Sequence, residues 1–490
     1  MNLPSDNRPE CLKGTQKETL RSIYNWVNTN RSPNVLLLIG GVGMGKSTIA
    51  KTVVETYRAK GLGCHLFFIR EKSNPAIALP TIAYKLAEYS LPVAEAIERH
   101  LRDVGELSSA TLRSKFEFLL RKPLSEAAAK ISSPVLIVLD AMDECGNHET
   151  RRSLLEVLRD GLPTLPPNFK FLITTRPKNG FCRISSPNFL VIRLDRKLEE
   201  NRLDVSTYIR YEFEQMKLNG ELHVLDDCPW DKHICTLADN ADGLFIWAAT
   251  AIRFVKEGGL RSFDRFQKLV TNAKSLNLSE LYKTVLAGAE AINWEEESVV
   301  FRSVFSLIFF SKSPLSDRDI NGILGLGGTI TPSLLSRFQS LITYEENKPI
   351  KIHHSSFYDY LVSCKGCPWY IDEKVEKERV VRVCFDRMEN LLQYNICQLE
   401  PSAAVFNANV SDLDERLKKN IPPSLRYICC NWAYHLRDVP YSQEICDKVR
   451  LFAQNRLLFW FEVLSLTDKF NDHAGTALLS AIAWVGVRIR

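Results

Sequence analysis

"LLLIGGVGMGKSTIAK", residues 36–51, decides the fold of this chain. The apolar run Val35 to Ile39 leads into its glycines and predicts a buried parallel strand. The text after the glycines, "STIAKTVVETYRAKG", has apolar residues at helical spacing and a stop signal at Gly61. Strand, glycine loop and helix are the context that the pattern G-x-x-x-x-G-K-S, residues 40–47, requires. The stretch therefore predicts a phosphate-binding loop, and a chance match to the pattern is the alternative.

The chemistry of such a loop follows from its residue types. Glycines let backbone N–H groups turn toward a phosphate where a side chain would collide, and the following helix adds its positive end. Lys46 is expected to reach the β- and γ-phosphates. Ser47 is expected to be a ligand of Mg²⁺.

The composition is that of an ordinary globular protein, with 45% hydrophobic and 25% charged residues. Its 490 residues suffice for about three or four domains. The formal charge of +5 is too small to argue for a nucleic acid or an anionic membrane as partner. No apolar run reaches the roughly 18 residues of a membrane span, and the first residues lack the features of a signal peptide.

The 13 cysteines are an odd number and are scattered, which favours a reducing, cytoplasmic setting over a disulfide scaffold. Cys364 and Cys367 form a single C-x-x-C with no second pair at zinc spacing, which argues against a zinc site. Cys429 and Cys430 are expected to be core residues of a helix.

Further strands are expected at 64–69, 135–139, 170–175 and 188–195, with helical text between them and a helix over 12–30 before the first strand. Strands that alternate with helices indicate an α/β fold with a parallel sheet covered on both faces. Ligands of such sheets bind at the carboxyl ends of the strands. The glycine loop, Asp140 and Arg176 all fall at such ends.

An acidic cluster follows the strand at 135–139. Asp140 is placed to hold Mg²⁺, as P-loop enzymes require of a neighbouring strand. Many ATPases have a glutamate directly after this aspartate, whereas here the position is Ala141 and the next acids are Asp143 and Glu144. One of these two would orient the attacking water; alternatively, the acids only begin a helix.

Arg176 ends the strand "KFLITT" and precedes Pro177. A guanidinium at this place could sense the γ-phosphate and report it to the following domain. The alternative is a surface arginine before a proline turn.

The strand signals fade after residue 200, and the text becomes helical. Near 296 the pattern changes again: helices at 314–326, with Ser316 as N-cap, and at 331–342 precede a hairpin around Asn347. Helix, helix and hairpin is the order of a winged helix. The segment from 366 to 490 is helical, with Glu373 and Lys377 as an i,i+4 pair.

Together these motifs resemble the NACHT subfamily of STAND P-loop NTPases. More narrowly, the chain resembles fungal NACHT proteins of the NOD-like receptor type, whose nucleotide-binding region is of the nephrocystin-3-like N-terminal type. The resemblance is carried by "CLKGTQKETLRSIYNW" (11–26), "GVGMGKSTIAKTV" (41–53), "VLIVLDAMDECG" (135–146), "FLITTRP" (171–177), "DGLFIWAATAIRFV" (242–255), "PLSDRDINGILGL" (314–326), "IHHSSFYDYL" (352–361), "RYICCNWAYHL" (426–436) and "LLFWFEVLSL" (457–466). The small residues between Asp140 and Asp143 are its most specific mark.

The resemblance implies a role for each site residue. ATP or ADP would bind at Gly40, Gly41, Val42, Gly43, Met44, Gly45, Lys46, Ser47 and Thr48, and Mg²⁺ at Ser47 and Asp140. Asp143 or Glu144 would serve hydrolysis and Arg176 would be the sensor. His354 would contact the β-phosphate of ADP in a closed state, although a histidine of this kind, with His353 beside it, is more often a core or surface residue.

The resemblance also implies a domain order. We expect a linker helix (1–32), an NTPase domain (33–200), a helical domain (201–295), a winged helix (296–365) and a C-terminal helical segment (366–490). Family members usually carry an effector domain before the NTPase and a repeat array after it. Neither has a signature here, so the chain is either a core-only member or a fragment.

The leading hypothesis is an ATP/ADP-dependent switch with slow hydrolysis that self-associates when ATP is bound and acts on an unidentified effector. The alternatives are a constitutive ATPase, remodelling enzyme or small-molecule kinase, a winged-helix regulator that binds DNA, and an inert remnant. The expected recognition segment of the winged helix, "TPSLLSRFQSLI", has one basic residue, Arg337, which speaks against nucleic acid as a partner.

Overall fold

The computed structural model describes residues 8–29, 33–102, 110–146, 148–177, 188–271, 277–288, 292–399, 410 and 412–486. The chain forms two compact units, Met1–Val285 and Leu286–Arg490. The first contains the sheet and the glycine loop, and the second contains a short hairpin and a large set of helices.

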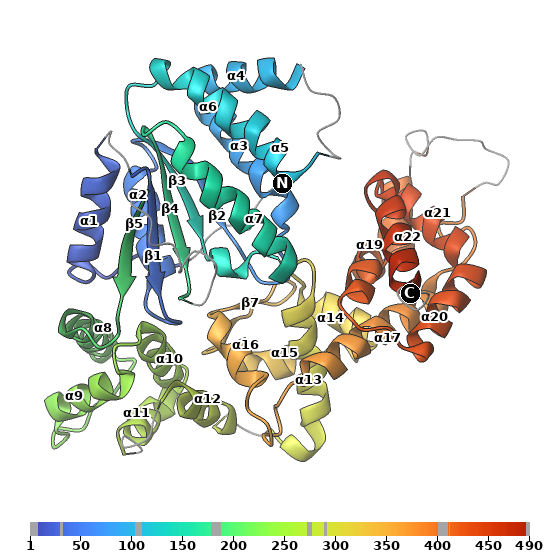
Figure 1. Ribbon diagram of the computed structural model, residues 1–490. Helices are drawn as coiled ribbons and strands as arrows, with labels where there is room; N and C mark the ends of the chain where they lie inside the picture. The colour runs from blue at the N-terminus through green and yellow to red at the C-terminus, as the bar shows by residue number, and fades with distance from the viewer. Residues whose placement is uncertain are drawn as a thin grey trace. The chain divides into compact units, whose positions relative to one another are not determined.

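A five-stranded parallel sheet forms the centre of the first unit (Figure 1). Its order is β2-β3-β4-β1-β5. The strands are β1 (Val35–Gly40), β2 (Leu62–Phe67), β3 (Val135–Asp140), β4 (Phe169–Thr175) and β5 (Phe189–Leu194). All five predicted strands form, within two residues of the expected ends, which confirms the α/β class. The strand that carries the glycine loop lies between β4 and β5 and is buried along its length.

Alternate residues of β1 enter different cores on the two faces of the sheet, as the pleat of a strand requires. Leu36 and Leu38 pack with α1 (Lys17–Val27) and α2 (Lys46–Tyr57). Val35, Leu37 and Ile39 pack on the opposite face. Helices cover that second face: α3 (Ala78–Tyr89), α4 (Leu91–Arg102), α5 (Leu112–Phe116), α6 (Lys122–Ala127) and α7 (His148–Gly161).

The helix expected over 12–30 is shorter, and α1 begins only at Lys17. Gly14 and Gln16 have φ angles of 105° and 55°, which a right-handed helix does not allow. The side-chain oxygen of Asp204 accepts the backbone N–H of Gln16 at 2.8 Å. The segment before α1 is therefore a turn that is tied to a later part of the same unit.

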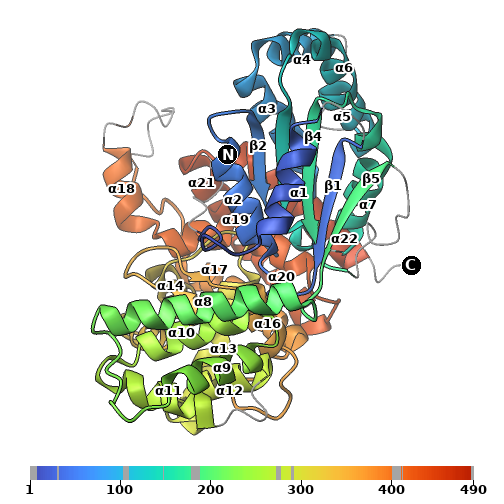
Figure 2. The same ribbon diagram turned by 90° about the vertical axis from the view of Figure 1, so that its left-hand side faces the viewer.

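The rest of the first unit is helical (Figure 2). The helices are α8 (Glu199–Leu218), α9 (Trp230–Ala241), α10 (Phe245–Lys256), α11 (Ser262–Thr271) and α12 (Leu278–Ala287), which runs across the boundary between the units. Asp242 and Gly243, with φ angles of 44° and 72°, end α9 and turn the chain into α10. The side-chain amide of Asn201 in α8 donates to the carbonyl of Gly243 at 2.7 Å and fixes this turn.

The second unit begins with helices and a hairpin in the predicted order. The elements are α13 (Trp294–Phe310), α14 (Asp317–Leu324), α15 (Ile330–Leu335), β6 (Ile342–Thr343), β7 (Lys351–Ile352) and α16 (Ser355–Leu361). Ser316 caps α14 in a capping box with Asp319, which confirms the predicted N-cap. Strands β6 and β7 are antiparallel, and Asn347 between them has a φ of 59°. The assignment of this region as a winged helix stays a prediction.

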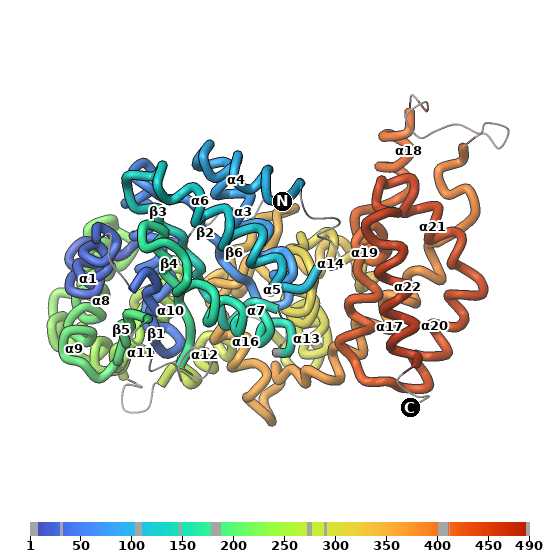
Figure 3. Tube along the Cα trace, turned by 45° about the horizontal axis from the view of Figure 1, so that its top comes forward, coloured from blue at the N-terminus to red at the C-terminus, as the bar shows by residue number. Residues whose placement is uncertain are grey.

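Among the described residues, the second unit continues with the helices α17 (Glu373–Leu391), α18 (Leu413–Asn420), α19 (Pro423–Arg437), α20 (Gln443–Asn455), α21 (Leu457–Leu466) and α22 (Phe470–Gly486) (Figure 3). Their core is aromatic, since Trp432 of α19 contacts the rings of Phe385, Phe452 and Trp460. The predicted pair of Glu373 and Lys377 forms at 2.7 Å. Within the described part of the chain, none of the helices has the length and hydropathy needed to span a membrane.

Candidate functional site

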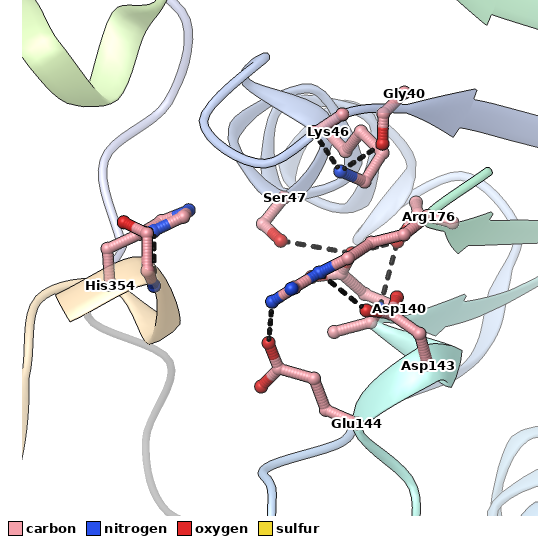
Figure 4. A network of polar contacts seen from close by, with 12 residues as sticks. Gly40, Lys46, Ser47, Asp140, Asp143, Glu144, Arg176 and His354 are labelled. Carbon is pink, nitrogen blue, oxygen red and sulfur yellow. Dashed lines mark hydrogen bonds and ion pairs between the residues drawn. The ribbon is translucent and has the colours of Figure 1, made fainter. Parts of the chain in front are cut away.

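The glycine loop lies at the carboxyl end of β1 and leads directly into α2. Gly43 and Gly45 have φ angles of 75° and 81°, a conformation that L side chains rarely adopt. Helix α2 begins at Lys46, so the positive end of its dipole lies at the loop. The Lys46 ammonium turns back and donates to the carbonyls of Gly40 at 2.9 Å and Gly41 at 2.7 Å (Figure 4).

Lys46 is a partly buried cation. Burial lowers the pKa of its ammonium, and the nearby Arg176 lowers it further, while the carboxylates of Asp143, Asp140 and Glu144 act in the opposite direction. A group that carries more negative charge than carbonyl oxygens would stabilise this ammonium more strongly. The loop therefore contains a lysine suited to a phosphate.

Asp140, the last residue of β3, is the centre of the polar network, and its side chain is fully buried. Its Oδ1 accepts a hydrogen bond from the Ser47 hydroxyl at 3.2 Å and a short one from the Thr174 hydroxyl of β4. The structure thus joins the predicted magnesium ligands, Ser47 and Asp140, although they are 93 positions apart.

Ala141 turns the chain sharply after β3. It has a φ of 58° and a ψ of 44°, a left-handed conformation that is uncommon for a residue other than glycine. Its N–H donates to the Thr174 hydroxyl at 2.8 Å, so one threonine fixes both the aspartate and the turn. A short 3₁₀ turn, Met142–Glu144, then presents the two acids.

Arg176 lies between these acids. Its Nε is 2.9 Å from Oδ2 of Asp143, and its Nη2 is 3.3 Å from Oε1 of Glu144. The side chains of Asp143 and Glu144 are 8% and 13% exposed and that of Arg176 is 22% exposed, so these ion pairs are largely shielded from water. The acids do not begin a helix, because α7 starts only at His148.

All the site residues predicted in the first unit lie within this region. Gly41, Val42, Met44 and Thr48 belong to the loop or to the first turn of α2. Their roles in binding remain predictions, since the structure establishes only where they lie.

His354 belongs to the second unit, so its expected contact with a phosphate stays a prediction. It is the N-cap of α16, and its Nδ1 accepts the N–H of Ser356 at 3.1 Å. In the neutral ring the proton is therefore on Nε2. Nε2 of the neighbouring His353 donates to the carbonyl of Gln339 at 2.8 Å, which gives the two histidines different surroundings.

Three residues that contact the site were not predicted from the sequence. Thr174 is the first. Ile246, at the start of α10, is the second: its N–H donates to the carbonyl of Gly43 at 3.3 Å, and a Cβ on Gly43 would lie 2.0 Å from its Cγ2. The third is Arg8, which contacts Asp140. Thr174 and Ile246 lie in stretches that carry the resemblance, but no pattern in the sequence pairs them with Asp140 and Gly43, or Arg8 with Asp140, because these contacts are long-range.

The residues present fit a magnesium–nucleotide. Mg²⁺ prefers hard oxygen ligands, and the Ser47 hydroxyl and the Asp140 carboxylate are such ligands. Among the residues described, no three His, Cys, Asp or Glu side chains cluster in a way that could hold a metal by themselves. A metal at Ser47 and Asp140 would therefore take its further ligands from phosphate oxygens and water.

Comparison with known protein families gives a match for the first part of the chain. Residues 14–176, about a third of the chain, match the family described as nephrocystin 3, N-terminal. This confirms the resemblance to the nephrocystin-3-like N-terminal type and, with the loop between β1 and α2, identifies a P-loop NTPase fold. A search of curated proteins found no match.

Among solved structures, the chain is similar to Cdc6p from Pyrobaculum aerophilum, with 15% identity, a TM-score of 0.34 and coverage of 78% of this chain and 97% of the other. A RuvB variant from Thermotoga maritima has 13% identity, a TM-score of 0.27 and coverage of 72% and 97%. A chain of Drosophila ORC bound to DNA has 12% identity, a TM-score of 0.33 and coverage of 74% and 94%.

Proposed function

We propose that this protein binds Mg²⁺ with ATP or ADP at the loop of residues 40–48 and acts as a nucleotide-dependent switch with slow hydrolysis. The observation that carries the proposal is the double ion pair of Arg176 with Asp143 and Glu144. It joins the expected sensor to both acids that could activate water.

A carboxylate must accept a proton or a hydrogen bond from water to orient the attack on a γ-phosphate. Asp143 and Glu144 instead share the Arg176 guanidinium, which competes with water for their lone pairs. Hydrolysis then requires Arg176 to move away from at least one acid. This supports a protein that holds its nucleotide and hydrolyses it slowly.

A γ-phosphate offers Arg176 a competing anionic partner with a higher charge. Movement of Arg176 toward it would release the acids, and this would be the difference between the ATP and ADP states that a switch requires. When bound, Mg²⁺ would neutralise phosphate charge, while Ser47 and Asp140 would hold its ligand sphere in place.

A second contact links the loop to the helical part of the first unit. The hydrogen bond from Ile246 to Gly43, and the packing of Phe245 on Gly45, place the start of α10 directly on the phosphate loop. A change in the loop on nucleotide binding would therefore act on α10. This supports a role in signalling rather than in catalysis alone.

At the level of class, we propose a NACHT-type STAND protein of the fungal NOD-like receptor kind, which functions in the cytoplasm in non-self recognition or programmed cell death. In this scheme it self-associates when ATP is bound and passes the signal to an effector. His354 would contribute an N–H donor from Nε2 to the ADP-bound state.

The test is to denature freshly purified protein, identify the nucleotide that is released, and measure ATP turnover. We expect ADP at close to one per chain and turnover well under about one per second. Lys46→Ala should contain none, whereas Lys51→Ala, a change on the same helix after the loop, should retain it. An empty wild-type site with rapid turnover would instead favour a constitutive ATPase, and a Lys46→Ala protein with full nucleotide content would refute the site.

A further inference from the structure

Arg8 forms an ion pair with Asp140, the carboxylate to which the metal is assigned. Its Nη1 is 2.5 Å from Oδ2 of Asp140. The Asp140 side chain is fully buried and that of Arg8 is 22% exposed, so the pair is shielded from most of the solvent. The two residues are 132 positions apart in the sequence, so the contact is a tertiary one.

With this contact, both oxygens of Asp140 are in use. Oδ1 accepts from Ser47 and Thr174, and Oδ2 accepts from Arg8. Ser47, the other expected metal ligand, also points at the carboxylate. A divalent cation bound to Oδ2 would lie where the Arg8 guanidinium lies, and the guanidinium would repel it at short range.

Two contacts hold Arg8 in position, one of its own side chain and one of a residue that follows it. Its guanidinium lies over the Phe67 ring, 3.5 Å from the centroid, and Phe67 ends β2 directly beside Asp140 in the sheet. Three residues later, the N–H of Cys11 donates to the Thr52 hydroxyl of α2 at 2.8 Å. The segment is thus attached to the helix that follows the phosphate loop, and from there Arg8 reaches the metal position.

We propose that residues 8–13 are a built-in inhibitor of metal–nucleotide binding: the Arg8 guanidinium takes the place of the divalent cation at Asp140 and must leave before Mg²⁺ can bind there. The inference rests on the proposed nucleotide site. It concerns a residue that precedes the family match, which begins at residue 14.

The competition has a measurable consequence. If the metal binds only to the fraction of molecules in which Arg8 has left, the apparent affinity is reduced by that fraction. Removal of the guanidinium leaves a buried carboxylate that accepts from two hydroxyls and has lost its ion pair with Arg8, which favours entry of Mg²⁺. Nucleotide without metal does not need Oδ2, so its affinity should depend little on Arg8.

The experiment is an equilibrium titration with N-methylanthraniloyl-ADP, once with Mg²⁺ and once with EDTA. Nucleotide-free wild type, Arg8→Ala and Lys13→Ala are compared. Lys13 is an exposed cation in the same segment, so its removal changes the net charge equally. We expect Arg8→Ala to bind about five- to tenfold more tightly with Mg²⁺ and unchanged with EDTA, and Lys13→Ala to resemble wild type in both.

Two outcomes of the titration would overturn the inference. An unchanged or weaker affinity of Arg8→Ala with Mg²⁺ would mean that Arg8 does not compete with the metal. An equal gain with and without Mg²⁺ would mean that it competes with phosphate instead. If folded wild type binds the probe neither with Mg²⁺ nor with EDTA, the proposed nucleotide site itself is wrong. This outcome differs from the two above, in which the protein binds nucleotide and only the role of Arg8 is wrong.

Hydrogen–deuterium exchange on the wild-type protein provides a readout that needs no variant. Addition of Mg²⁺ and ADP should speed exchange of the Cys11 amide, whose bond to Thr52 depends on the attached segment. ADP with EDTA should not. Equal or slower exchange with Mg²⁺ would show that the segment stays in place, and the inference would be wrong.

Discussion

Thr174, which was not among the predicted site residues, joins Asp140 to the turn that follows it. Its hydroxyl donates to Oδ1 of Asp140 and accepts the N–H of Ala141, and its side chain is buried between them. A buried hydroxyl that serves two partners leaves both unsatisfied when it is removed.

Thr174→Val should therefore lower the free energy of unfolding by about 2–3 kcal/mol, because the shape is retained while two buried polar groups lose a partner. It should also weaken Mg²⁺–ADP binding more than binding of ADP with EDTA, since the carboxylate is less firmly oriented. Urea denaturation and the fluorescent titration measure the two effects. Thr174→Ser keeps the hydroxyl and is the control; a valine variant with wild-type stability would show that water replaces the hydroxyl.

At the scale of single residues, the sequence predicted most of the site but not how its parts are joined. The loop, Asp140 and Arg176 were identifiable because the carboxyl ends of parallel strands converge. Thr174 was not, since a threonine in a buried strand has many ordinary roles. Arg8 and Ile246 act across long stretches of chain, where no spacing rule applies.

At the scale of elements, the contact of α10 with the loop should have a measurable effect on the free energy of unfolding. Gly43 has a left-handed φ, and any Cβ there would overlap the Ile246 side chain. The two causes of damage are distinct: strain in the backbone and overlap with a helix.

Gly43→Ala should lower the free energy of unfolding by about 3 kcal/mol or more and abolish nucleotide binding. In the double variant Gly43→Ala/Ile246→Ala the overlap with Cγ2 of Ile246 is removed, while the close approach to the Cβ of residue 246, the backbone strain of about 1–2 kcal/mol and the cost of truncating Ile246 remain. A double-mutant cycle, with stability and nucleotide affinity as readouts, measures the coupling. Strictly additive losses would mean that α10 does not constrain the loop.

The strands were predictable as elements because each is a short and mostly apolar run. The start of α1 was not, because the helical pattern extends back over residues 12–16 while Gly14 and Gln16 take positive φ angles. That turn is stabilised by Asp204, a tertiary contact that local sequence does not report.

At the scale of the whole molecule, the second unit contains a buried histidine that ties stability to pH. Burial, and to a lesser degree Lys312 and Lys377, lowers the pKa of His435 from 6.5 to about 3. Between these two pH values the unfolded chain binds a proton that the folded one does not. Stability is therefore lost as the pH falls below 6.5.

From pH 7 to pH 5.5 this histidine should lower the free energy of unfolding by about 1 kcal/mol. Urea titrations followed by tryptophan fluorescence at the two pH values give the difference for wild type. In His435→Gln, which titrates no group at this position, the drop should be smaller by that amount. An identical drop in both proteins would mean that His435 is not the proton acceptor.

The left-handed turn at Ala141 also bears on how this protein can change over generations. A single base change converts an alanine codon to one for glutamate, the residue that many ATPases have directly after the metal-binding aspartate. It also leads to valine, threonine and proline, and each of these tolerates a positive φ worse than alanine does. Glycine is the neighbouring codon that fits without strain. A glutamate at this position would have to adopt the same left-handed φ, so the backbone at Ala141 resists the residue that would place a carboxylate directly after Asp140.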